Sequence, residues 1–347
     1  MSKRKKGKVG FLVGFLIILV IITAILLYLK MSKTENANIL KNNVLVALIK
    51  EEPKKEIKIF NGNDRPIAVM IDNVGDARPQ TGLNDAYMVY EIIVEGKQSR
   101  LMALYKNTQL DKIGPIRSSR HYFLDYALEN DAIYVHYGWS PKAKSDISSL
   151  NVNNINGIYE SSKSFWRVKD KSAPHNVVTS TKNILEIAKR KGYNTTTTKE
   201  SVLNYNTEEV DLEDGIVATN IKLPYSNSYS VSYKYDAETK KYARYYNKTL
   251  QKDWKTKETV QTKNIIVTFA KNSTLNDGSG KDRQNLYNIG TLDGYYITNG
   301  KAIKIKCYKS SRKEQTVYKD LNGNEIKVND GNTFVQIVPI DANITIE

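Results

Sequence analysis

The hydropathy pattern opens with a long apolar run near the start of the chain. Residues 9–29 contain no charged side chain and are bordered by Lys8 and Lys30. At a rise of about 1.5 Å per residue, a helix of this length crosses a hydrocarbon core of roughly 30 Å. Basic residues fill the segment before the run, and basic flanks stay on the cytoplasmic side of a membrane. The pattern predicts a single-pass membrane anchor, with residues 1–8 in the cytoplasm and the remainder extracytoplasmic.

A cleaved signal peptide is the alternative interpretation of this run. The apolar region of a signal peptide usually has about 7–15 residues and ends in a small-x-small cleavage site. The run here is longer, and its end, Leu26-Leu27-Tyr28-Leu29, contains no such site. The single cysteine of the chain is Cys307, so no cysteine near the run could carry an N-terminal lipid. These observations favour an uncleaved transmembrane helix.

Residues 30–63 are polar and predict a stalk or linker, with a helical part over residues 39–48. Short apolar runs then alternate with turns from residue 64 to residue 198. The runs predict buried strands, and segments that follow helix-start signals predict helices. The expected strands are 67–71, 86–94, 101–105 and 132–135, and the expected helices are 118–128 and 179–189.

After residue 199 the pattern changes to tyrosine-rich alternation, as in residues 229–235 and 242–246. Asn-Gly and Asp-Gly dipeptides separate the short runs, and these dipeptides favour tight hairpin turns. The expected turns are at Asn276-Asp277-Gly278, Asp293-Gly294, Asn299-Gly300, Asn322-Gly323 and Asp330-Gly331. We therefore expect an α+β fold, with a mixed α/β N-terminal domain (residues 64–198) and a mostly antiparallel, β-rich C-terminal domain (residues 199–347).

Composition narrows the possible functions. The 347 residues include 52 Lys+Arg and 37 Asp+Glu, a net charge of +15. Six basic residues flank the apolar run, where they would set the orientation of the chain in the membrane. The rest of the chain therefore has a net charge of +9. An extracytoplasmic position weighs against nucleic acid as a partner and favours anionic wall polymers or lipid head groups. One cysteine excludes an intramolecular disulfide and a zinc site built on several thiolates. Few cysteines are typical of proteins exported by Gram-positive bacteria, and we expect no cofactor and no metal.

The polar residues of the N-terminal domain gather where predicted strands end, the usual place for a site in an α/β sheet. The segment Gly114-Pro115-Ile116-Arg117-Ser118 enters a predicted helix, whose free N–H groups and dipole would favour an anion. The alternative is that Arg117 and Arg120 pair with acids such as Glu91 and Glu95 and only fasten the helix. The candidate ligand-binding residues are Asn73, Arg78, Gln80, Arg100, Arg117, Ser118, Arg120, Trp166, Arg167 and Asn176.

Histidine supplies the candidate acid/base chemistry, because its pKa lies near neutral pH. His136 follows a predicted strand, and His175 lies in a Pro-His-Asn turn. Asp72, Glu91 or Glu95 could orient one of them. A histidine that only bonds to a backbone carbonyl is the alternative. Two histidines and a carboxylate could also bind a metal, but a separation of 39 residues is typical of no known metal motif.

Eight motifs along the chain together carry a resemblance to a known family: Arg65 to Asn73, Ala77 to Leu83, Gly114 to Arg120, Val135 to Gly138, Ala173 to Asn176, Tyr242 to Arg244, Asn264 to Val267 and Asp330 to Val335. They resemble the motifs of the YerB-like family. The resemblance covers roughly residues 64–340 and implies two-domain envelope proteins of Gram-positive bacteria, without established catalytic residues. Many members resemble lipoproteins, whereas this chain has an apolar membrane segment instead.

Two functional hypotheses follow. The first is a membrane-anchored binding or scaffolding module of the cell envelope, which engages an anionic polymer, lipid or protein through an arginine-rich cleft. The second is an envelope hydrolase or transferase that uses His136 or His175 as general acid/base on an anionic substrate. They differ in geometry. The second requires His136, His175 and a carboxylate to converge within hydrogen-bond reach in one open pocket with Arg117, whereas histidines that lie apart or are buried against backbone carbonyls would argue against it.

Overall fold

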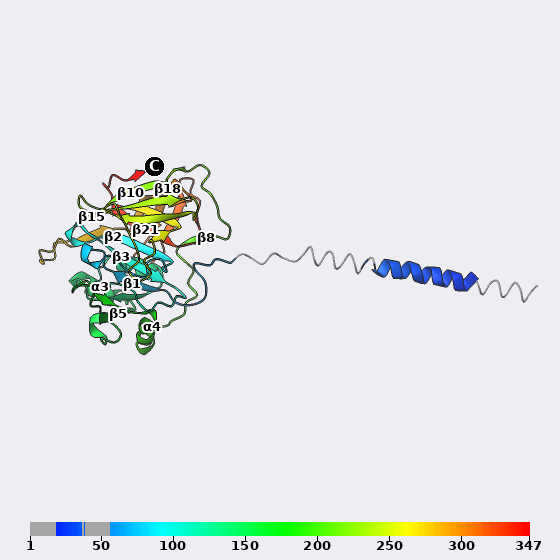
Figure 1. The fold of residues 1–347 in the computed structure, drawn as a ribbon, viewed down its shortest axis with the longest axis horizontal. Helices are drawn as coiled ribbons and strands as arrows, with labels where there is room; N and C mark the ends of the chain where they lie inside the picture. Colours follow the sequence, from blue (N-terminus) through cyan, green and yellow to red (C-terminus); the bar gives the residue numbers. More distant parts are fainter. Residues whose placement is uncertain (1–18, 37, 39–55) are drawn as a thin grey trace, which may run out of the picture. The chain divides into compact units, whose positions relative to one another are not determined.

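The computed structural model describes residues 19–36, 38 and 56–347 (Figure 1). The chain divides into two compact units, residues 1–55 and residues 56–347. In the first unit the described residues form a helix over 19–36. No helix in the described part of the chain combines the length and the apolar character that a membrane span needs. The expected cytoplasmic segment, residues 9–18 of the expected anchor and the expected helix 39–48 lie outside the described residues.

The second unit is built on a twelve-stranded sheet. Its strands in spatial order are β19 (Val317–Asp320), β18 (Lys301–Lys309), β17 (Gly290–Thr298), β15 (Asn264–Thr274), β21 (Thr333–Pro339), β2 (Met88–Ile93), β3 (Ser99–Tyr105), β1 (Ile67–Ile71), β4 (Ile133–His136) and β5 (Asn154–Asn156). Two further strands pair at its margins: β16 (Gln284–Tyr287) with β15, and β9 (Ile216–Val217) with β18.

The other strands form three smaller sheets. The six-stranded sheet has the order β13 (Thr249–Leu250), β12 (Lys241–Tyr246), β11 (Ser230–Asp236), β10 (Asn220–Pro224) and β22 (Thr345–Ile346), with β14 (Gln261–Thr262) beside β12. The two-stranded sheets pair β20 (Lys327–Asn329) with β8 (Asn204–Asn206), and β6 (Trp166–Arg167) with β7 (Val177–Val178). The helices are α2 (Phe123–Glu129), α3 (Pro141–Ser149) and α4 (Thr181–Arg190), with 3-10 turns at Gly75–Ala77, Glu95–Lys97 and Gly157–Tyr159.

The large sheet is covered on both faces, which explains why its central strands are continuous apolar runs. Because side chains alternate across a strand, Val69 of β1 faces one core and Met70 the other. The first core includes Ile184 of α4 and Tyr233 of the six-stranded sheet. The second core includes Phe123 of α2 and other side chains from α2 and α3. The predicted strand 67–71 is confirmed with the same ends.

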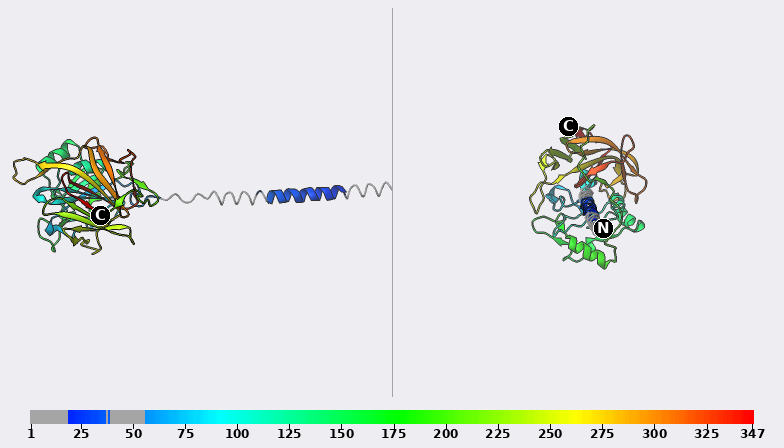
Figure 2. Two further views of the ribbon diagram at one scale, coloured as in Figure 1. Left: turned by 90° about the horizontal axis from the view of Figure 1, so that it is seen from above. Right: turned by 90° about the vertical axis from the view of Figure 1, so that its right-hand side faces the viewer.

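The two predicted domains share this sheet. Strand β21, from the C-terminal part, lies between β15 and β2 and is parallel to both. In Figure 1, β10, β15, β18 and β21 lie in the upper half of this unit, β1, β5, α3 and α4 lie in the lower half, and β2 and β3 lie between them. The right-hand view of Figure 2 shows the same division, with orange strands above and green segments below. A mixed fold with abundant β-sheet is thus confirmed, whereas the boundary at residues 198 and 199 stays a prediction.

The expected helix 118–128 is wrong at its start. Helix α2 begins at Phe123, because residues 116–119 bond as extended chain to neighbouring segments. The Arg117 N–H donates to the Met70 carbonyl, and the Ser119 N–H donates to the Gly138 carbonyl. Helix α4 was expected over 179–189 and is found at Thr181–Arg190, with the Ser180 hydroxyl accepting from the Asn183 N–H as an N-cap.

The predicted hairpin turn is confirmed at Asn299-Gly300 and is wrong at Asp293-Gly294. Asn299 and Gly300 join β17 to β18 with φ values of 48° and 75°, as a two-residue turn of the expected kind requires. Asp293-Gly294 is not a turn but lies inside β17. A Cβ on Gly294 would lie 2.2 Å from the Val267 carbonyl oxygen, so close approach of strand β15 explains this glycine.

Candidate functional site

The buried carboxylate of Asp72 is the centre of the candidate site. Asp72 follows β1 directly and is 1% exposed. Its Oδ2 atom lies 2.7 Å from Nδ1 of His175 and 3.1 Å from Nε of Arg117. Its Oδ1 atom is buried and has no hydrogen-bond partner among the described residues. Asp72, Arg117 and His175 are called the Asp72 site below.

Local pairing explains how three distant segments meet there. The Asp72 N–H donates to the Pro115 carbonyl, and Ile116 forms a bridge with Ile71, so residues 114–117 run beside the end of β1. His175 lies in the loop after β6, which Asn176 closes. The Asn176 side-chain amide donates to the carbonyls of Val168 and Lys171, both at 3.1 Å. The site is therefore held by backbone pairing on one side and by an asparagine clamp on the other.

Two other candidate arginines lie against one internal carboxylate, that of Glu95. Arg120 donates Nε to Oε2 of Glu95 at 2.8 Å and makes a second bond to the same carboxylate. Arg100 lies 3.6 Å from Glu95 and donates to the Ser118 carbonyl. Burial would raise the pKa of Glu95, but the bond from Arg120 and the charges of both arginines lower it to about 2. Burial lowers the pKa of Arg100 to about 10. The alternative of an internal Arg120–Glu95 pair is thus the one observed.

The helix-based argument for an anion at residues 114–118 is wrong, because the N–H groups of Ile116 and Arg117 are already bonded and no helix begins at Ser118. The Ser118 hydroxyl is also used, since it donates to the Tyr137 carbonyl at 3.0 Å. What remains available is the Arg117 side chain itself, which is 27% exposed. Its Nε lies against Asp72, and its two terminal nitrogens make no hydrogen bond within the described residues.

His136 does not join the site. It is fully buried, with Nδ1 2.7 Å from the Gly138 carbonyl oxygen and Nε2 3.2 Å from Oδ1 of Asn154. Burial lowers the pKa of His136 to about 4, so the imidazole is neutral near pH 7. His136 is thus a histidine that bonds to a backbone carbonyl, which was the alternative to acid/base chemistry. Of the two candidate histidines, His175 alone meets a carboxylate.

The remaining candidate ligand-binding residues contact the backbone of Asp72 or residues next to the Asp72 site. Gln80 donates to the Asp72 carbonyl at 2.9 Å and to Oδ1 of Asn73 at 2.8 Å. Arg78 donates to the Asn73 carbonyl and stacks its guanidinium 4.0 Å from the centre of the Tyr246 ring. Arg167 donates to Oδ1 of Asn176 at 2.6 Å. Trp166 is half-buried beside it in the small sheet of β6 and β7.

One buried ion pair was missed at the sequence level. Arg244 of β12 lies 2.7 Å from Oε2 of Glu91 in β2, and both side chains are 0% exposed. The Glu91 carboxylate also accepts from Ser99 and Tyr229. The available signal was spacing: Arg244 follows Tyr242 by two residues, so both point to the same face of a strand. A charged residue in an apolar register indicates a buried partner.

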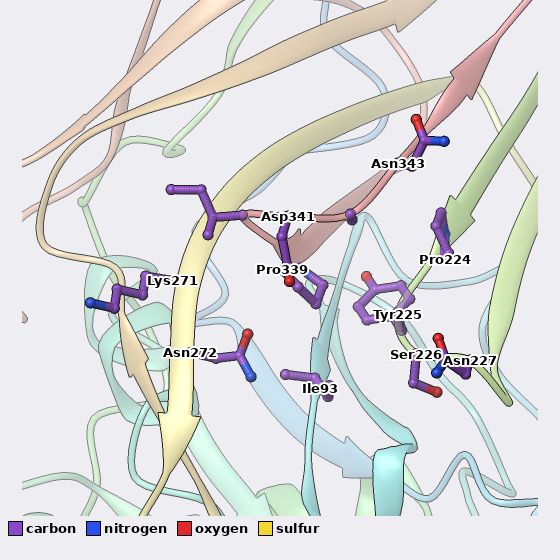
Figure 3. A pocket seen from close by; sticks show the side chains of 12 residues that line it. Ile93, Pro224, Tyr225, Ser226, Asn227, Lys271, Asn272, Pro339, Asp341 and Asn343 are labelled. Carbon is purple, nitrogen blue, oxygen red and sulfur yellow. The ribbon is translucent and has the colours of Figure 1, made fainter.

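A hollow of about 710 Å³ has none of the candidate site residues in its lining (Figure 3). It opens where the end of β2, the link from β10 to β11 and the chain after β21 come together, and its charged side chains are Lys271 and Asp341. Its lining residues are Ile93, Pro224, Tyr225, Ser226, Asn227, Lys271, Asn272, Pro339, Ile340, Asp341, Ala342 and Asn343. No group of three or more metal-ligating side chains occurs among the described residues.

The family follows from comparison with known protein families. Residues 53–194 match the model of the N-terminal domain of "Protein of unknown function (DUF3048)", and residues 221–335 match the model of its C-terminal domain. The chain belongs to this YerB-like family. The resemblance seen in the sequence is thereby confirmed.

A relative and a solved structure agree with this assignment. The Bacillus subtilis (strain 168) protein described as "Putative lipoprotein YerB" is 30% identical over 290 residues, which are 80% of this chain and 82% of that protein. The crystal structure of the YerB protein from Bacillus subtilis superposes with a TM-score of 0.73 at 28% identity. That match covers 85% of this chain and all of the YerB chain.

Proposed function

We propose that this member of the YerB-like family is an extracytoplasmic envelope protein held at the membrane by residues 9–29. The uncharged run between basic residues supports the anchor, since its length and flanks suit a membrane span. The description of the Bacillus relative as a lipoprotein supports the location, because lipoproteins are also attached to a membrane. In this proposal the present chain uses a helix where its relative would use a lipid.

The function that the geometry supports best is binding of an anionic group at the Asp72 site. The observation that carries it is the convergence of Arg117 and His175 on one buried carboxylate oxygen. The carboxylate orients both side chains through Nε and Nδ1. The terminal guanidinium nitrogens and Nε2 of the imidazole make no bond to other described residues. The Arg117 guanidinium is thereby oriented with its two terminal nitrogens free to donate to a phosphate or carboxylate of an envelope polymer, lipid or protein.

Affinity measurements on the full-length protein in detergent test this proposal. The probes are an isolated phosphate-containing wall polymer and vesicles of phosphatidylglycerol. We expect Arg117→Gln to weaken binding about 5- to 10-fold, because it removes the partly exposed guanidinium charge that Asp72 orients. Arg190→Gln is the matched control, since Arg190 lies on α4 and its side chain is 62% exposed. If folded Arg117→Gln binds both probes as tightly as the unchanged protein, the proposal is wrong.

The hydrogen bond between His175 and Asp72 favours a second candidate function. A carboxylate at 2.7 Å from Nδ1 fixes the imidazole with Nε2 free to take or give a proton, as in general acid/base catalysis. An envelope hydrolase or transferase of this kind would use His175 as acid/base and Arg117 to hold its anionic substrate. Incubation with the same wall polymer tests it: cleavage products that disappear in His175→Gln would support an enzyme, and no cleavage by the unchanged protein would exclude one for this polymer.

A further inference from the structure

A second basic feature lies beside the Asp72 site. The indole ring of Trp254 is half-buried and carries two lysine ammonium groups, with Nζ of Lys112 at 4.5 Å and Nζ of Lys171 at 4.7 Å from the ring centre. No carboxylate forms an ion pair with either lysine among the described residues. The acid next to Lys112, Asp111, pairs instead with Lys255 at 2.5 Å. Because an aromatic face positions a cation without neutralising it, both ammonium groups keep their charge for a ligand.

The loop that carries Trp254 is held in place by hydrogen bonds to the Asp253 carboxylate. The Asp253 carboxylate accepts from the Gly82 N–H at 2.8 Å and from the Thr81 hydroxyl at 3.1 Å. It also accepts from two N–H groups of its own loop, at Lys255 and Thr256. The buried carboxylate therefore ties this loop of the C-terminal part to the segment that follows Gln80. Trp254 presents its ring from a position set before any ligand arrives.

Two amide side chains connect this feature to the Asp72 site. The side-chain amide of Gln80 donates to the Asp72 carbonyl, and the backbone carbonyl of Gln80 accepts from the backbone N–H of Trp254 at 2.7 Å. Asn176 follows His175 and donates to the Lys171 carbonyl at 3.1 Å. His175 and Lys171 thus belong to one clamped loop, while Asp72 and Trp254 share one glutamine. The cations of the two features lie on neighbouring, mutually fixed segments.

We propose that Lys112, Lys171 and Trp254 extend the Asp72 site into a strip that binds a linear polyanion with repeated phosphate groups. The inference rests on the proposed function and names its ligand class. A single small anion would need one cluster of donors, whereas cations spread along adjoining segments match charges spread along a chain. The strip uses residues from both parts of the family, since Trp254 belongs to the C-terminal part and the other residues to the N-terminal part. The strip thus consists of the Asp72 site (Asp72, Arg117 and His175) together with Lys112, Lys171 and Trp254, and Gln80 connects its two ends.

The test uses the full-length protein in detergent, with long-chain inorganic polyphosphate as the probe and tryptophan fluorescence or calorimetry as the readout. The double variant Lys112→Gln, Lys171→Gln should bind about 25-fold more weakly at low salt, if each lysine contributes about fivefold. Trp254→Ala should bind about 2- to 5-fold more weakly, because the lysines remain but lose their aromatic support. Lys319→Gln is the matched control. This lysine also lies over an aromatic ring, that of Tyr308, but on the marginal strand β19 of the large sheet, seven strands away from β1, so the variant should bind unchanged.

The results distinguish the proposed strip from the proposed binding of an anion at the Asp72 site alone. If the double lysine variant binds polyphosphate within twofold of the unchanged protein while Arg117→Gln weakens it, the strip is wrong and the Asp72 site stands. If neither variant weakens binding, both proposals fail. A third arm uses phosphatidylglycerol vesicles: lysine-dependent capture of vesicles without any binding of polyphosphate would overturn the polymer as occupant and assign the lysines to a lipid surface. Equal unfolding temperatures of all variants confirm that they are folded.

Discussion

Two histidines show how strongly the surroundings of a residue decide its role. His136 and His175 both follow turns or strand ends in the N-terminal part and look equally suited to chemistry in the sequence. The first is enclosed between a carbonyl and an asparagine and is held neutral. The second is partly exposed and bonds to a buried carboxylate. The sequence could name both residues but could not rank them, because enclosure depends on strands and loops that lie far away in the chain.

The lowered pKa of His136 has a consequence for stability. Its pKa is about 4 in the folded protein, against an ordinary value of 6.5, so the unfolded chain takes up the proton at a higher pH. Stability from this group is complete above pH 6.5 and is lost as the pH falls toward 4. Between about pH 7.5 and about pH 5 the loss should be about 2 kcal/mol. Chemical denaturation at both pH values measures it.

The control for this effect is His136→Gln, which cannot titrate. Other groups also change charge in this range, so the informative quantity is the difference in pH dependence between the unchanged protein and the variant. The variant should lose about 2 kcal/mol less over the same interval. Parallel stability curves for the two proteins would show that His136 does not carry the effect.

Among the elements, helix α3 is one that the sequence analysis did not predict. The segment Gly138-Trp139-Ser140-Pro141-Lys142 begins like the turn around a catalytic serine. In the structure Ser140 is an N-cap: its hydroxyl accepts from the Ala143 N–H, and Pro141 occupies the first turn. Serine followed by proline is also a helix-start signal, since proline suits the first helical position. The helix-start signal was therefore present in the sequence at Ser140-Pro141, although the same segment also resembles the turn around a catalytic serine.

The N-cap predicts a measurable loss. Ser140→Ala should destabilise the protein by about 1 kcal/mol, because the Ala143 N–H loses its partner. Ser145→Ala is the control, since Ser145 is exposed in the middle of the same helix and alanine there should be neutral or slightly stabilising. Denaturant unfolding compares the two variants. An equal effect of both substitutions would contradict the capping role.

At the scale of the whole molecule, the notable result is how closely the two family segments are joined. Local apolar patterns predicted many strands, and β1 was predicted with its correct ends. They could not predict that β21 would lie between β15 and β2, because strand pairing joins residues more than 200 positions apart and leaves no local trace. The buried pairs Glu91–Arg244 and Glu129–Lys309 join the same segments.

The Glu91–Arg244 pair should contribute strongly to the stability of the contact between the two family segments. Arg244→Met leaves the buried Glu91 carboxylate without its cation, which should cost about 3–5 kcal/mol. Glu91→Gln combined with Arg244→Met should recover part of that loss, because no unpaired charge remains. Lys182→Met is the surface control, as Lys182 is 82% exposed and its pairing with Glu186 contributes little. If Arg244→Met unfolds at the same denaturant concentration as this control, the pair does not fasten the two segments.

The most direct test of the account is whether an anion reaches the Asp72 site. The chain has only three histidines, so nitrogen NMR of histidine-labelled full-length protein resolves His121, His136 and His175. Addition of long-chain polyphosphate should shift the ring signals of His175, because its Nε2 faces the proposed ligand. The enclosed ring of His136 and the His121 ring, bonded to Asn285, should stay unchanged. Polyphosphate that binds without moving the His175 signals would contradict the proposed site.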